Sequence, residues 1–143
     1  MSRWMIVAAI SIWAASVLPQ TAIAQTSIRV AQSACLDENS DPVACTIWAM
    51  HLIQNGQGEE IERGGRMLAL TCQAGWANAC YRHGIVAGQR IAGVGAADWE
   101  ERYSLRLACD LEHAQGCFAL AQLYRDGDGV DREASTALAL ASK

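Results

Sequence analysis

The sequence predicts an all-α fold: an α-α superhelix, or solenoid, of about two and a half to three helix-turn-helix repeats followed by a C-terminal closing helix. Three observations predict it. Pairs of cysteines recur every 35 to 37 residues, a helical stripe follows the second cysteine of each pair, and glycines follow each stripe. A period in the thirties is typical of helix-turn-helix solenoids, in which each unit buries its apolar face only against its neighbours.

The six cysteines form the clearest pattern. The first cysteines of the three pairs are Cys35, Cys72 and Cys109, and the second cysteines are Cys45, Cys80 and Cys117. A disulfide needs Cα atoms within about 7 Å, whereas residues eight apart in one continuous helix are separated by roughly 12 Å. The thiols of a pair can therefore meet only if the chain reverses direction between them.

Each second cysteine is followed by a helical stripe. Counted from that cysteine, offset 3 holds Trp48, His83 or Leu120, offset 4 holds Ala49, Gly84 or Ala121, and offset 7 holds Leu52, Ala87 or Tyr124. Residues at these offsets share one face of an α-helix, and the small residue at offset 4 predicts where another helix backbone passes closely. The glycines after each stripe predict the turns that end the helix.

The sequence before each first cysteine predicts the other helix of the pair. The stretches IERGGRMLALTC and DWEERYSLRLAC share the ending L-x-L-x-C. The C-terminal stretch DREASTALALASK repeats this ending, with Leu138 in the place of Leu105 and Ser142 in the place of Cys109. We therefore expect a closing helix over residues 131–142.

The repeated unit is A-C-x7-C-x2-L-[GA]-x2-[LY]-x2-G-x-G-V, and it is cleanest in residues 108–130. It resembles the cysteine-rich branch of the Sel-one-like repeat family, whose members are related to tetratricopeptide repeats. The chain departs from this pattern in the ten-residue spacing of the first cysteine pair, in His83 at the leucine position and in Ala87 at the aromatic position. The resemblance implies a disulfide-stapled solenoid of antiparallel helix pairs, with bridges Cys35–Cys45, Cys72–Cys80 and Cys109–Cys117.

Residues 1–24 are predicted to be a secretory signal peptide. Arg3 precedes an apolar run that is too short for a membrane span, and Ala22-Ile23-Ala24 forms a cleavage site. An uncleaved signal anchor is the alternative. We expect one domain over residues 25–143, with units at about 26–58, 59–95 and 96–130 before the closing helix. An even number of cysteines in a small exported protein indicates a disulfide framework, and the predicted location is periplasmic or secreted.

The charge of the chain excludes some classes of partner. The formal net charge is −4, and without Arg3 the 10 remaining basic and 15 acidic residues give 10 − 15 = −5. An acidic chain without clusters of basic residues argues against nucleic acid or an anionic membrane as the partner.

The sequence carries no recognisable catalytic motif. It has no G-x-S-x-G, S-x-x-K, H-E-x-x-H or C-x-x-C, and metal sites and redox pairs usually need C-x2-C. We predict no catalytic residue, no cofactor and no metal. His83 should point inward, where it can titrate near neutral pH or bind a ligand, or be a hydrogen-bonded residue between helices. The resemblance also implies an alternative function, in which the protein binds or hydrolyses β-lactams or cell-wall fragments.

The predicted function is that of a non-catalytic protein-protein interaction module of the cell envelope. Trp99, Arg102, Tyr103 and Arg106 form a candidate binding patch on one helix, because aromatic residues and arginine dominate binding energies at interfaces. The alternative is that the two aromatic residues pack on the neighbouring repeat. By resemblance the protein is an adaptor, a regulator or an immunity-type binder of another protein or peptide, and a homodimer could form through residues 137–141.

Overall fold

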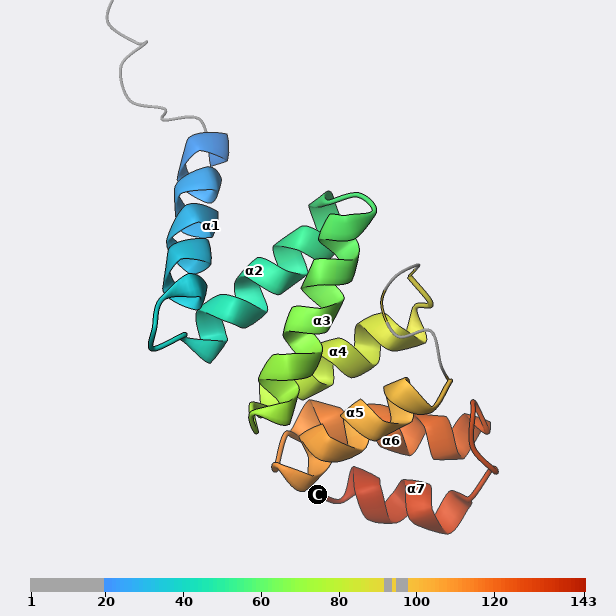
Figure 1. Ribbon diagram of the computed structural model, residues 1–143. Helices are drawn as coiled ribbons and strands as arrows, with labels where there is room; N and C mark the ends of the chain where they lie inside the picture. The colour runs from blue at the N-terminus through green and yellow to red at the C-terminus, as the bar shows by residue number, and fades with distance from the viewer. Residues whose placement is uncertain (1–19, 92–93, 95–97) are drawn as a thin grey trace, which may run out of the picture.

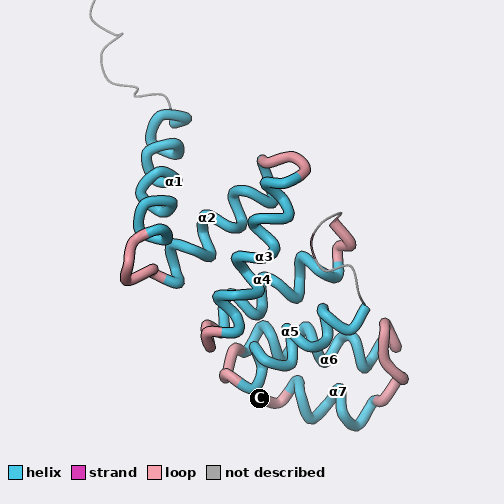
Figure 2. Tube along the Cα trace, viewed as in Figure 1, coloured by secondary structure: helices cyan, strands magenta, loops and turns pink. Residues whose placement is uncertain are grey.

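The computed structural model describes residues 20–91, 94 and 98–143, and these residues form seven α-helices (Figure 1). The helices are α1 (Gln20–Leu36), α2 (Pro42–Asn55), α3 (Glu59–Gln73), α4 (Ala77–Gly88), α5 (Asp98–Asp110), α6 (Ala114–Asp126) and α7 (Ala134–Ala141). Figure 2 shows only helices and connecting turns within this part of the chain. The prediction of an all-α fold is confirmed.

The helices stack in chain order. Each helix contacts the one before it and the one after it, and α2, α4 and α6 also contact one another in sequence. We call α1, α3 and α5 the first helices, and α2, α4 and α6 the second helices, of three pairs. The stack runs from α1 at one end to α7 at the other (Figure 1), as expected for a solenoid of helix pairs.

A disulfide lies at the chain reversal within each pair. The bridges are Cys35–Cys45, Cys72–Cys80 and Cys109–Cys117, with Cα atoms 4.6, 4.5 and 4.4 Å apart, respectively. The first pair is ten residues apart because the turn between α1 and α2 is longer, and there Asp41 accepts a hydrogen bond from the Val43 amide at 2.9 Å and caps α2. The bridges therefore join helices that are consecutive in the chain.

The stripe after each second cysteine is turned inward. Its members are buried, except that Tyr124 is half-buried. The small residue at offset 4 lies where α4 crosses α5: a Cβ atom added to Gly84 would come within 2.7 Å of Leu105 Cγ. Gly84 therefore allows an approach of the two helices that a larger residue would obstruct.

Part of the predicted organisation lies beyond what the structure tests. Residues 1–19 are outside the described part of the chain, and the expected cleavage point after Ala24 falls within α1. The signal peptide and the boundaries of the repeat units therefore stay predictions. No helix in the described residues is long and apolar enough to cross a membrane.

Removing one bridge should lower the stability of the folded chain. In the double variant Cys109→Ala/Cys117→Ala we expect the free energy of unfolding to fall by about 2–3 kcal/mol, because the bridge closes a loop of about nine residues in the unfolded chain. Urea unfolding followed by circular dichroism measures the change. The folded-state spectrum should stay the same, and a loss below about 0.5 kcal/mol would contradict a stabilising role for the bridge.

Candidate protein-binding surface

Two aromatic side chains stand on the outward side of α5. Trp99 is 55% exposed and Tyr103 is 51% exposed, whereas Leu105 on the inward side is buried. Their spacing of four residues brings the two rings together on one side of the helix, edge to face, with 6.0 Å between the centroids. The aromatic pair thus packs on itself and faces solvent, and it is not buried against the neighbouring repeat.

The two arginines predicted beside this pair have different contacts. Arg102 donates a hydrogen bond from Nη1 to the carbonyl oxygen of Gly129 at 3.0 Å, which ties α5 to the turn before α7. The Nε atom of Arg106 is 3.9 Å from Asp110 Oδ2 in an exposed pair one helical turn apart, and such pairs are weak in water. Arg102 therefore has a structural contact, while Arg106 remains available to a partner.

A groove of about 470 Å³ lies beside α3 and the turn that joins α1 to α2. It is lined by Cys35, Ser40, Pro42, Cys45, Arg63, Arg66, Met67, Leu70, Thr71 and Ala74. Leu70 is 65% exposed, so the lining offers a solvent-facing apolar side chain. Arg66 has an exposed partner in Glu62 at 3.4 Å, and Arg63 has no ion pair with the described residues. The groove thus combines apolar surface with positive charge.

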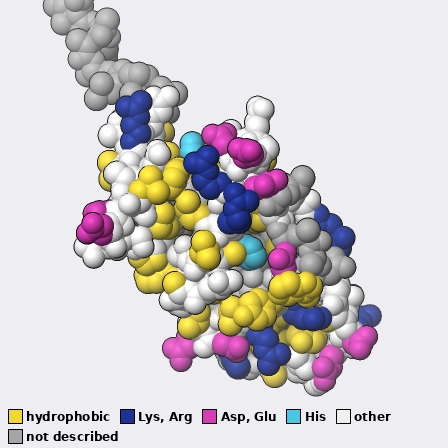
Figure 3. Space-filling view, viewed as in Figure 1, with side chains coloured by type: hydrophobic (Ala, Val, Ile, Leu, Met, Phe, Trp, Pro, Cys, Tyr) yellow, Lys and Arg dark blue, Asp and Glu magenta, His cyan; other side chains and the backbone are white. Residues whose placement is uncertain are grey.

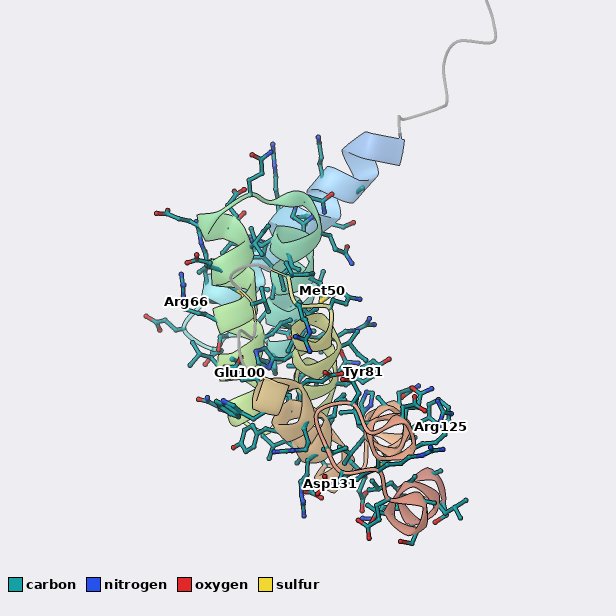
Figure 4. The ribbon with its side chains drawn as sticks, turned by 90° about the vertical axis from the view of Figure 1, so that its right-hand side faces the viewer. Met50, Arg66, Tyr81, Glu100, Arg125 and Asp131 are labelled. Carbon is teal, nitrogen blue, oxygen red and sulfur yellow. A yellow bond between two sulfur atoms is a disulfide. The ribbon has the colours of Figure 1, made fainter. Side chains whose placement is uncertain are left out.

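The groove and the aromatic pair lie on the same side of the molecule. Arg66 and Tyr103 are both six residues before a first cysteine, so they occupy equivalent positions of α3 and α5. Figure 4 shows Arg66 on one side of the stack and Tyr81 on the other, and Figure 3 shows hydrophobic and basic side chains side by side over α3 and α5. We call this surface the first-helix face. Its residues are Arg63, Arg66, Leu70, Trp99, Tyr103 and Arg106.

His83 lies inside the stack, away from the first-helix face. Its ring is buried between α4 and α5, and Nδ1 is 2.7 Å from Ser104 Oγ. Burial lowers the pKa of His83, and the charge of nearby Glu100 partly opposes that shift. Both members of this hydroxyl–imidazole pair are buried, so the pair links two repeats and does not present a reactive group to solvent.

A second groove, more polar than the groove beside α3, lies over the second helices. It has a volume of about 360 Å³ and is lined by Ile28, Thr46, Ile47, Met50, His51, Gln54, Asn78 and Arg82. Beside it the ring of Tyr81 stacks on His113, with 4.9 Å between centroids. His113 also caps α6, where Nδ1 accepts a hydrogen bond from the Gly116 amide at 3.2 Å. This stack joins the second helices of neighbouring repeats.

The sequence predicted only part of the first-helix face as a candidate surface. It named the aromatic pair and Arg106, but it missed the groove beside α3. Leu70 is one of the leucines of the shared L-x-L-x-C ending, and no signal in the sequence marks it as exposed. Sequence reasoning also missed Ser104 as the partner of His83, since the two residues are 21 positions apart. Among the described residues no group of three histidine, cysteine or acidic side chains could hold a metal ion.

Comparison with solved structures supports the same fold. The chain is similar to a Sel1 repeat protein from Oxalobacter formigenes, with a TM-score of 0.62 and 16% sequence identity over 93% of this chain and 94% of that chain. No family model and no curated protein matches the sequence. At this level of identity the likeness establishes a shared fold of Sel1-like helical repeats.

The burial of His83 predicts how stability depends on pH. Because burial lowers its pKa below the ordinary value of 6.5, the unfolded chain binds the proton more readily than the folded chain. Stability should be full above pH 6.5 and should fall as the pH drops from 6.5 towards the folded pKa. Urea unfolding between neutral and mildly acidic pH measures this loss.

The control is His83→Gln, which keeps a polar group beside Ser104 but does not titrate in this range. Its stability should depend less on pH than that of the natural chain. His113, whose pKa is also lowered by burial, is present in both proteins and cancels in the comparison. Equal pH dependence in the two proteins would show that His83 is not the group that titrates.

Proposed function

We propose that the protein is an exported interaction module that binds a segment of another cell-envelope protein on its first-helix face. Helical repeat folds of this kind generally present an extended surface to a protein partner. The observation that carries the proposal is the exposed aromatic pair Trp99–Tyr103 of α5, where Tyr103 holds the position that the exposed Arg66 holds on α3. Adaptor, regulator and immunity-type binder are roles that such a module can serve.

The chemistry of the face indicates what the partner segment should contain. Trp99, Tyr103 and Leu70 offer apolar surface, and aromatic side chains supply a large share of binding energy at interfaces. Arg63 has no ion pair with the described residues, and the pairs made by Arg66 and Arg106 are exposed and weak. A segment with an apolar side chain flanked by acidic residues would satisfy both features, and the arginines would attract it to an otherwise acidic protein.

The proposed location follows from the cysteines. All six are in disulfides, and disulfides persist in oxidising, extracytoplasmic environments. Together with the predicted signal peptide, this supports a periplasmic or secreted protein, whose partners would be met in the same compartment.

Cross-linking in the cell tests the surface. A photoreactive phenylalanine analogue placed at Tyr103 or at Leu70 should capture the same envelope protein. The analogue at Ile47, an exposed position on the opposite, second-helix side, is the control and should not capture it. Equal capture from position 47, or no capture from either position on the first-helix face, would rule out this face as the binding surface.

Truncating the aromatic pair should then weaken binding to the captured partner. We expect Trp99→Ala/Tyr103→Ala to raise the dissociation constant at least tenfold, about 1.4 kcal/mol, because both side chains are exposed and their loss should spare the fold. Isothermal titration calorimetry measures the change. Ile47→Ala should bind like the natural chain, and an effect of the same size in that control would contradict the proposal.

A further inference from the structure

Leu138 is exposed at a position that the other repeats bury. Leu68 and Leu105 both lie four residues before a first cysteine, and Leu138 occupies the matching place in α7. Leu68 is 0% exposed and Leu105 is 1% exposed, whereas Leu138 is 73% exposed. The same side chain at the same point of the repeat therefore has opposite environments.

The difference follows from the number of second helices that cover the leucine. Leu68 packs with Ala49 and Ile53 of α2 and with Val86 of α4. In the next repeat Leu105 packs between α4 and α6 in the same way. Leu138 has α6 on one side, but none of the described helices covers its other side.

The uncovered side of α6 and α7 forms an apolar groove of about 340 Å³. Its lining is Phe118, Ala121, Gln122 and Arg125 of α6 with Ala134, Ala137, Leu138 and Ala141 of α7. Arg125 is the single charged residue in this lining, and its Nε is already paired with Asp126 Oδ1 at 2.7 Å. The groove is therefore suited to an uncharged helix.

Phe118 of α6 is likewise uncovered by the described residues, although its equivalent in the previous repeat has a neighbour. It is the residue after a second cysteine, and the equivalent Tyr81 stacks on His113 at the start of the next second helix. Phe118 is exposed instead. Both side chains thus lack a contact that a helix lying antiparallel to α7, in the position of a second helix, would supply.

We propose that this helix is α7 of a second copy of the chain, in a two-fold symmetric dimer. A two-fold axis perpendicular to α7 sets the two α7 helices antiparallel, which is the orientation of first and second helices within each repeat. Each α7 then lies beside α7 of the other copy as a second helix lies beside its first helix within each pair. The protruding Leu138 of one copy enters the groove of the other, and the reverse contact is identical.

The composition of α7 favours a copy of itself as the occupant. The helix ASTALALA carries no charge, and Ala134, Leu138 and Ala141 at intervals of four and three residues place small side chains on both sides of the leucine. Small residues allow the backbones to approach closely, as Gly84 does between α4 and α5. Because one surface offers both the protruding side chain and the groove, it is complementary to itself.

Sedimentation equilibrium tests the dimer. The eight residues of α7 make a small interface, so the experiment covers about 10 µM to 1 mM protein, the range of weak association. The weight-average mass of the natural chain should rise towards twice the monomer mass. Leu138→Glu, which places a charge in the contact, should stay monomeric over the whole range.

Leu36→Glu is the matched control, since Leu36 is similarly exposed but lies in α1 at the other end of the stack. It should associate like the natural chain, and circular dichroism should show that both variants are folded. Leu138→Cys should cross-link to itself with a short bis-maleimide, because the two-fold axis brings both copies of residue 138 together. A natural chain that stays monomeric, loss of association in Leu36→Glu, or absence of this cross-link would overturn the proposal.

Discussion

The disulfide at each chain reversal is the constraint on which the rest of the structure depends. It holds the Cα atoms of the two bridged cysteines 4.4–4.6 Å apart at one end of each helix pair. The bridge thereby sets where each second helix begins relative to its first helix. A chain of this size buries a small core, and three bridges worth about 2–3 kcal/mol each are comparable with the roughly 5–15 kcal/mol net stability of a typical domain. The helix pairs can therefore stack on modest cores of alanine, leucine and cysteine.

Because a bridge fixes how the two helices of every pair cross, the distance of a residue from a cysteine can indicate whether its side chain is buried. Residues at the same distance from a cysteine are buried alike in the stripe that follows each second cysteine, except that Tyr124 is half-buried. Two positions of the repeat show how a change of residue or of neighbour is accommodated. Polar His83 stands where Trp48 and Leu120 stand, and it is accommodated because Ser104 of the next helix supplies a hydrogen bond. Leu138 is exposed where Leu105 is buried, because Leu105 packs with both α4 and α6 whereas, among the described helices, α7 contacts α6.

The fold could be predicted from the sequence because its signals are periodic. Cysteine spacing, the stripe with Ala49, Gly84 and Ala121, and the glycine turns all recur at the same interval, and each occurrence supports the others. The surface could be predicted only in part. Trp99 and Tyr103 are recognisable by residue type, whereas the groove beside α3 arises from the turn between α1 and α2, whose path no repeated feature specifies. The stack of Tyr81 on His113 depends on how far each repeat is rotated relative to the next. The spacing of the cysteines in the sequence does not specify that rotation.

The two proposed interactions use separate parts of the molecule. The first-helix face is made of residues on α3 and α5, while the groove around Leu138 is lined only by α6 and α7. Dimerisation would therefore leave the first-helix face of each copy open, and the dimer would present two such faces in a fixed relation. If the partner is itself repeated or anchored in the envelope, the second binding event becomes intramolecular and the apparent affinity rises without any new contact. A weak dimer and a modest binding face could together give an apparent affinity that neither small surface would provide alone.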